Sequence, residues 1–103
     1  MVLARLTRNF SAAVDATPVI ISDAKERQSF SIMNTGATKI TIVMSDTDIA
    51  VAGAGIVLNP NSSVTDSDAA GYMAWRGNIS ACGDGAGGTL AVFERIYNPA
   101  TGV

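Results

Sequence analysis

The sequence contains no histidine and only one cysteine, Cys82. Without histidine there is no Ser-His-Asp or Cys-His pair to activate a nucleophile, and no imidazole to bind a metal or titrate near neutral pH. A single cysteine cannot form a disulfide within the chain, and its place in an alternating apolar run predicts a small buried side chain. These absences point away from an enzyme, so we expect no catalytic residues and no cofactor.

Charge and long apolar runs are also scarce. Charged residues make up 16% of the 103 residues and the formal net charge is −2, too little positive charge to neutralise several phosphates at once. No apolar run approaches the roughly 20 residues that cross a bilayer. The N-terminus carries Arg5 and Arg8 and lacks the apolar core of a signal peptide. We therefore expect no nucleic-acid or membrane partner, and folding in a reducing cytoplasm.

What the sequence has instead is a series of short segments in which apolar and polar side chains alternate. Residues 29–33 and 39–44 show this period of two clearly, which is typical of strands with one buried face. The residues between them include Gly36, which suits a positive φ in a tight turn. We therefore predict a β-hairpin here.

Further short strands are expected along the rest of the chain, at residues 19–21, 56–58, 64–65, 72–75, 79–82 and 89–96. Their spacing of about 8–12 residues, with no credible helix after Pro18, predicts an all-β fold. The expected architecture is a single-domain antiparallel β-sandwich, jelly-roll-like, with roughly seven or eight strands. The expected divisions are an extended N-terminal arm at 1–16, the sandwich at 17–97 and a C-terminal tail at 98–103.

Two Asp-x-Asp pairs are the strongest candidates for metal ligands. Asp46 and Asp48, or Asp66 and Asp68, would point to the same side of a strand and offer two oxygens to a hard cation. Neither pair has further ligands at the spacing of a calcium loop, so ordinary solvated loops are the favoured interpretation. The glycine-rich residues 83–88 match a dinucleotide fingerprint only formally, because a β segment follows them, and we predict a hairpin tip.

The aromatic residues allow three interpretations. Trp75 and Phe93 are expected in the core. Together with Tyr72 they could alternatively form a sugar-stacking platform or part of a subunit interface.

The run Arg-Gln-Ser-Phe-Ser-Ile-Met-Asn-Thr-Gly at residues 27–36, followed by an Ile/Val strand, resembles small structural proteins of tailed bacteriophages. The resemblance covers residues 18–96 and includes the segments 56–61, 71–75 and 89–94. It implies a β-sandwich of the head-decoration (cement) or head-fibre type that binds the outer capsid surface, often as a trimer. It also implies the major capsid protein and further copies of the chain as partners, and no catalytic residue.

The leading hypothesis is therefore a capsid decoration protein, located on the virion and assembled in the host cytoplasm. Its two ends are expected to contact neighbouring subunits and to add strands to neighbouring sheets. The candidate interface residues are Arg5, Arg8, Phe10, Tyr97 and Pro99. The alternatives are a tail, collar or fibre-base module, and a carbohydrate-binding module that uses Tyr72 and Trp75. Oligomeric state, host and head or tail location stay open.

Overall fold

The structure of the chain, a computed structural model, describes residues 4–98. This part of the chain consists of strands, turns and loops, and none of it forms a helix that has the length and apolar character needed to span a bilayer. The strands are β1 (Ala4–Val14), β2 (Val19–Ser22), β3 (Arg27–Asn34), β4 (Ile40–Met44), β5 (Ile56–Leu58), β6 (Ser63–Ser67), β7 (Ile79–Gly83) and β8 (Gly88–Asn98).

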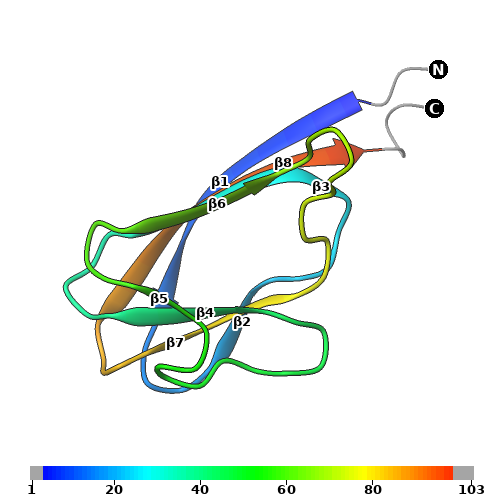
Figure 1. Cartoon of the computed structure of the whole chain (residues 1–103). Coiled ribbons are helices and arrows are strands. Elements are labelled where there is room, and N and C mark those ends of the chain that lie inside the picture. The colour runs from blue at the N-terminus through cyan, green and yellow to red at the C-terminus, as the bar shows by residue number, and fades with distance from the viewer. Residues whose placement is uncertain (1–3, 99–103) are drawn as a thin grey trace.

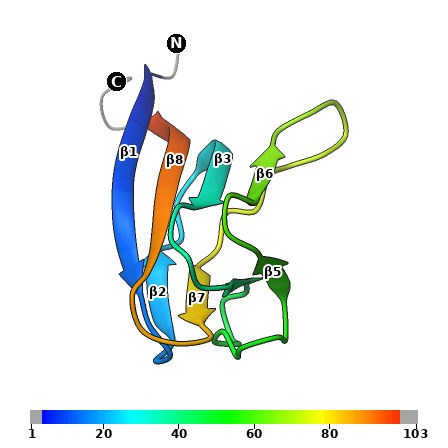
Figure 2. The ribbon, with the colours of Figure 1, turned by 90° about the vertical axis from the view of Figure 1, so that its left-hand side faces the viewer.

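The eight strands form two antiparallel sheets that pack face to face (Figure 1). The first sheet has the order β1-β8-β3-β6 and the second has the order β2-β7-β4-β5. Figure 2 looks along the two layers and shows β1 above β2 at one side of the sandwich and β6 above β5 at the other. Two four-stranded sheets in this order are a jelly roll, so the predicted fold class is confirmed.

The core lies between the sheets and follows from the period-two alternation. Phe30 and Ile32 of β3 are buried beside Leu90 and Val92 of β8, and Ile42 of β4 is buried on the facing sheet. The intervening positions of the first sheet are mostly Ser, Thr and Asn, which tolerate water on the outer face.

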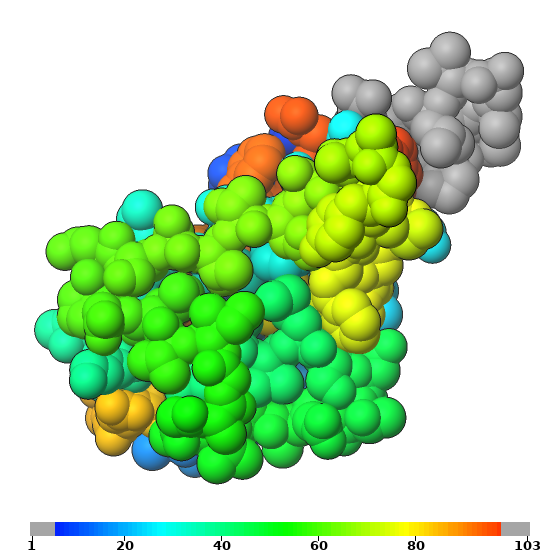
Figure 3. Space-filling model, in the orientation of Figure 1, coloured from blue at the N-terminus to red at the C-terminus, as the bar shows by residue number. Residues whose placement is uncertain are grey.

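The outer face of the second sheet is covered by the loop at residues 45–55. The Ala50 amide donates to Ser80 Oγ at 2.9 Å, and the Gly53 amide donates to Thr41 Oγ1 at 2.9 Å. Figure 3 shows this green segment on the face of the molecule toward the viewer. Because the core covers one face of β7 and the loop the other, all five residues of β7 are buried, Cys82 among them, as expected for that side chain.

The predicted hairpin at residues 29–44 is wrong, because β3 and β4 belong to different sheets. Buried Asn34 directs the crossing: its Nδ2 donates to the carbonyl oxygens of Thr38 and Leu58, and its Oδ1 accepts from the Gly36 amide. Gly36 does not have a positive φ. A Cβ added at Gly36 would lie 3.0 Å from the backbone nitrogen of Thr89, so close backbone approach favours glycine here.

Two smaller expectations also differ from the structure. The glycine-rich residues 84–87 connect β7 of the second sheet to β8 of the first and are therefore a crossing, not a hairpin tip. Residues 72–75, which were expected to form a strand, do not form one. Tyr72 makes only an isolated bridge with Ala69. Here side-chain contacts to the loop, described below, replace the ladder of a sheet.

The N-terminal segment expected as an extended arm is extended, and it forms the outer strand of the first sheet. β1 pairs with β8 without a break in register from Ala4 opposite Asn98 to Val14 opposite Gly88. Val14 is part of the hydrophobic core and Phe10 packs against it. The segment is therefore built into the sandwich over the described residues.

Candidate functional site

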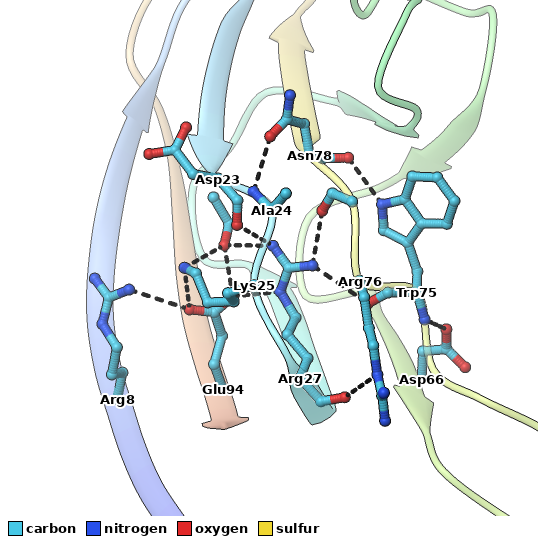
Figure 4. Close-up of polar contacts among 12 residues, drawn as sticks. Arg8, Asp23, Ala24, Lys25, Arg27, Asp66, Trp75, Arg76, Asn78 and Glu94 are labelled. Atoms are coloured by element: carbon cyan, nitrogen blue, oxygen red, sulfur yellow. Dashed lines mark hydrogen bonds and ion pairs between the residues drawn. The ribbon is translucent and has the colours of Figure 1, made fainter. Parts of the chain in front are cut away.

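A group of charged side chains, in which Arg27 and Glu94 are fully buried and Arg8 and Lys25 are partly exposed, lies where the connection from β2 to β3 meets β8 (Figure 4). The carboxylate of Glu94 accepts hydrogen bonds from Ser22 Oγ at 2.5 Å and from Arg27 Nε at 2.7 Å. Lys25 Nζ donates to it at 3.1 Å, and Arg8 Nη1 lies 3.5 Å away. The side chains of Glu94 and Arg27 have no exposure to solvent.

Arg27 connects this group, which we call the Glu94 cluster, to the backbone of two loops. Its Nη1 donates to the carbonyl oxygens of Trp75 at 3.2 Å and Gly77 at 2.7 Å. Its Nη2 donates to the carbonyl oxygen of Asp23 at 2.8 Å and to Ser22 Oγ at 2.8 Å. A guanidinium offers its donors in a fixed plane, so Arg27 fixes both loops relative to β3.

The electrostatics of the Glu94 cluster favour a fixed negative charge. Burial by itself raises the pKa of Glu94, but donation from Ser22, Arg27 and Lys25 outweighs this and lowers the pKa below its ordinary value. A carboxylate can accept about four hydrogen bonds, and the four contacts from Ser22, Lys25, Arg27 and Arg8 use that capacity. Glu94 therefore holds structure together and has no lone pair left for a substrate or a cation.

The Glu94 cluster was not predicted from the sequence, although a signal was present. Glu94 occupies the inward-facing position of β8 that continues the apolar series of Leu90 and Val92. A charged residue in an inward position needs a buried partner. The partner itself, Arg27, could not be identified from the sequence, because the pairing of β3 with β8 does not follow from alternation.

Asp66 and Asp68 fasten the loop between β6 and β7. Asp66 Oδ2 accepts from the Trp75 amide at 2.9 Å, and Asp68 Oδ1 accepts from the Ala74 amide at 2.9 Å. Asp68 Oδ2 also accepts from Arg76 Nη2 at 2.9 Å. The hydrogen bond from the Ala74 amide is the largest cause that lowers the pKa of Asp68.

The other pair of aspartates divides its roles. Asp46 Oδ1 accepts from the Asn78 amide at 2.8 Å and so fixes the start of the loop that covers the second sheet. Asp48 is exposed on that loop. Within residues 4–98, the acidic and cysteine side chains form no group of three or more that could hold a metal ion. Binding of a cation by either Asp-x-Asp pair stays an untested alternative.

The aromatic residues of the C-terminal half have different surroundings. Trp75 is partly buried against the hydrophobic core, and its Nε1 donates to the Asn78 carbonyl oxygen at 2.9 Å. Phe93 lies on the outer face of β8, opposite Asn9 and Ser31, where it is half-buried and lines a shallow hollow, so it is not a core residue. Tyr72 is exposed, and its hydroxyl donates to Asp66 Oδ1 at 2.9 Å.

All of the predicted interface residues except Pro99 lie on β1 or β8. Arg8 and Phe10 lie on the inward face of β1, with the Arg8 guanidinium 4.9 Å from the centre of the Phe10 ring. The backbone of Arg5 pairs with Tyr97, and the Tyr97 hydroxyl donates to Asp68 Oδ2. Pro99 lies outside the described residues. Whether these residues contact another subunit stays a prediction.

The outer edge of β1 is a long strand edge without a neighbouring strand in the part of the chain that the structure describes. β1 ends the first sheet, so one side of its 11-residue backbone has no neighbouring strand among residues 4–98. It contains no proline, no lysine and no bulge. The opposite edge, β6, is five residues long and includes Asp66.

Comparison with known proteins places the fold but not a family. No protein-family model and no curated protein matches the sequence. Among solved structures, the chain is similar to a protein from Bacillus endospore appendages, described as forming a novel family of disulfide-linked pili. The two share 16% sequence identity and a TM-score of 0.53, over 92% of this chain and 88% of that chain. This likeness shows a shared fold with a small β-rich protein and involves no phage protein.

Proposed function

We propose that this chain is a non-catalytic structural protein that works in many copies on a larger extracellular or virion assembly. The observation that carries the proposal is the uncovered edge of β1, which runs along the sandwich for 11 residues. Its free backbone groups would add to the strand of another subunit by β-augmentation.

The physical reason is that an open edge of this length is a liability in an isolated protein. Natural sheets protect their edges with short strands, charged side chains, proline or bulges. β6 is short and carries an acidic residue, whereas β1 is long and regular and has only the charges of Arg5 and Arg8 along it. A long, regular edge with so few protecting features suits a chain whose normal state includes a partner on that edge.

The finer proposal is decoration of a bacteriophage head, supported by the resemblance of residues 27–44 to phage structural proteins. A capsid lattice presents many copies of one site, so several weak contacts can act together. A second candidate is a subunit of a cell-surface appendage, favoured by the fold shared with the Bacillus pilus protein. Both assemblies repeat one subunit and differ in location and geometry.

Quantitative immunolabelling tests the proposal. Antibodies against the chain are applied to purified phage particles and to cell-surface appendages from the source of the sequence, and copies are counted against a known standard. Dense labelling of heads supports decoration, and labelling along a fibre supports the appendage. Protein found only free and monomeric overturns the proposal.

An edge variant tests the contribution of β1. Thr7→Lys with Ser11→Lys places two charges on exposed positions of β1, and it is expected to reduce incorporation several-fold because like charges oppose strand pairing. The matched control, Ser63→Lys with Ser67→Lys, places the same charges on exposed positions of β6 and is expected to incorporate normally. Equal incorporation of the two variants would remove β1 from the assembly contact.

A further inference from the structure

We propose that two copies of this chain pair through β1, antiparallel, around a two-fold axis at Asn9. The pairing would join the two first sheets into one continuous sheet of eight strands. This inference deepens the proposed function by naming a second copy as the occupant of the β1 edge, and it rests on that function only in requiring that copies meet.

The length and regularity of β1 favour a partner strand of equal length. β1 keeps its register with β8 over all 11 residues, so its outer edge presents an unbroken series of backbone groups. β6 offers five residues and β2 four. Among the strand edges in the described part of the chain, only another β1 satisfies the whole edge, and a self-complementary contact closes as a dimer.

Exposed aliphatic side chains lie on the same side of the sandwich as this edge. Leu6 of β1 is 47% exposed, and Val19 and Ile20 of β2 are 40% and 47% exposed. β1 and β2 are the edge strands of the two sheets on that side (Figure 2). In the dimer, a two-fold axis perpendicular to the joined β1–β1 sheet leaves the second sheet of each copy on the same side of that joined sheet. The β2 strands of the two copies therefore approach each other and cover these side chains.

The register follows from the sequence of β1. Residues directly opposite each other share a face of the sheet. The axis must therefore lie midway between one residue of β1 and the same residue in the other copy. Asn9 is the middle residue of Ala4–Val14, and an axis there pairs all 11 residues. An axis at Arg8 would place two guanidinium groups opposite each other, and like charges in that position are destabilising.

The side chains that meet in the Asn9 register are complementary. On the outer face Asn9 meets Asn9, and Thr7 meets Ser11, all exposed in the single chain. On the inward face Leu6 meets Ala12, and Arg8 of one copy meets Phe10 of the other. Arg8 already lies over the Phe10 ring within the chain at 4.9 Å, and a second guanidinium–ring contact uses the same attraction.

Cysteine crosslinking tests both the partner and the register. Asn9→Cys is treated with a short bismaleimide, which bridges two thiols without requiring disulfide geometry. The wild type controls for Cys82, which is buried. Thr65→Cys on β6 and Ser11→Cys on β1 are exposed matched controls, and sedimentation gives the mass of each variant.

Asn9→Cys is expected to yield several-fold more crosslinked dimer than either control, from a species that sediments as a dimer. A yield no higher than that of Thr65→Cys would overturn pairing through β1. A maximum at Ser11→Cys would overturn the register, and a trimer mass would overturn the two-fold axis. Dense labelling of a particle combined with no crosslink at Asn9 would overturn this inference and leave the proposed function standing.

Discussion

At the scale of single residues, Glu94 is the side chain on which most of the polar interior depends. Its carboxylate neutralises Arg27, and both side chains are without solvent exposure. Removing one partner of a buried ion pair leaves the other charged in a low-dielectric environment, which costs more than the pair contributed. The effect of a substitution is therefore large and specific to this position.

We expect Glu94→Ala to lower the free energy of unfolding by about 3–5 kcal/mol, because Arg27 stays buried without a counter-charge. Urea denaturation followed by circular dichroism measures the change. The control is Glu26→Ala, which removes one of the two acidic partners of Arg76 at a side chain that is 62% exposed and should cost about 0–1 kcal/mol. Equal losses in the two variants would show that the Glu94 cluster does not hold the loops.

The same residue predicts how stability depends on pH. The pKa of Glu94 is lowered below its ordinary value in the folded chain, so its ionised form contributes stability at neutral pH, and the contribution is lost as pH falls through the folded pKa. The stability difference between the wild type and Glu94→Gln should be greatest at neutral pH and shrink as the pH falls below the ordinary pKa of a glutamate. Asp68, whose pKa is also lowered, is present in both proteins and cancels. A difference that stays constant from neutral to acidic pH would contradict the assignment.

At the scale of strands, the sequence predicted which residues form strands better than which strands pair. Alternation in residues 29–33 and 39–44 identified β3 and β4 and their buried faces. It carried no information on partners, because the buried faces of a hairpin and of two facing sheets look alike in sequence. Of the polar contacts that Asn34 makes at the crossing to the other sheet, those with Gly36 and Thr38 are local, and the contact with Leu58 of β5 forms only when that distant strand is in place.

The junction of β1 and β8 gives a prediction at this scale. A Cβ at Gly88 would lie 2.5 Å from the Val14 carbonyl oxygen, so Gly88→Ala must push the two strands apart at a cost of about 1–3 kcal/mol. Gly85→Ala is the control, since a Cβ there meets nothing within 4 Å and should change stability by less than about 0.5 kcal/mol. Thermal unfolding of both variants measures the contrast, and similar midpoints would contradict tight packing at this end.

At the scale of the whole molecule, composition and spacing were enough to predict a jelly-roll-like sandwich. Short alternating segments, frequent turn residues and the lack of a helical stretch leave few other architectures. The Glu94 cluster could not be predicted at this scale, because Arg8, Arg27 and Glu94 come from three strands that meet only in the finished sheet. Nor could the role of the N-terminal segment, since its partner β8 is at the other end of the chain.

β1 and β8 come from the two ends of the chain and pair in the first sheet. This pairing predicts the effect of removing β1. A chain that begins at Asp15 lacks Val14 from the core and leaves β8 without a neighbour along one side. We expect it to lose cooperative unfolding and its ordered β signal in circular dichroism, because β1 covers core residues as well as an edge. The variant with Thr7→Lys and Ser11→Lys keeps β1 and should unfold cooperatively near the wild-type midpoint. A truncated chain with a sharp transition would show that the sandwich folds without β1, whereas its collapse beside a folded lysine variant would show that β1 completes the domain through its core residues and its pairing with β8.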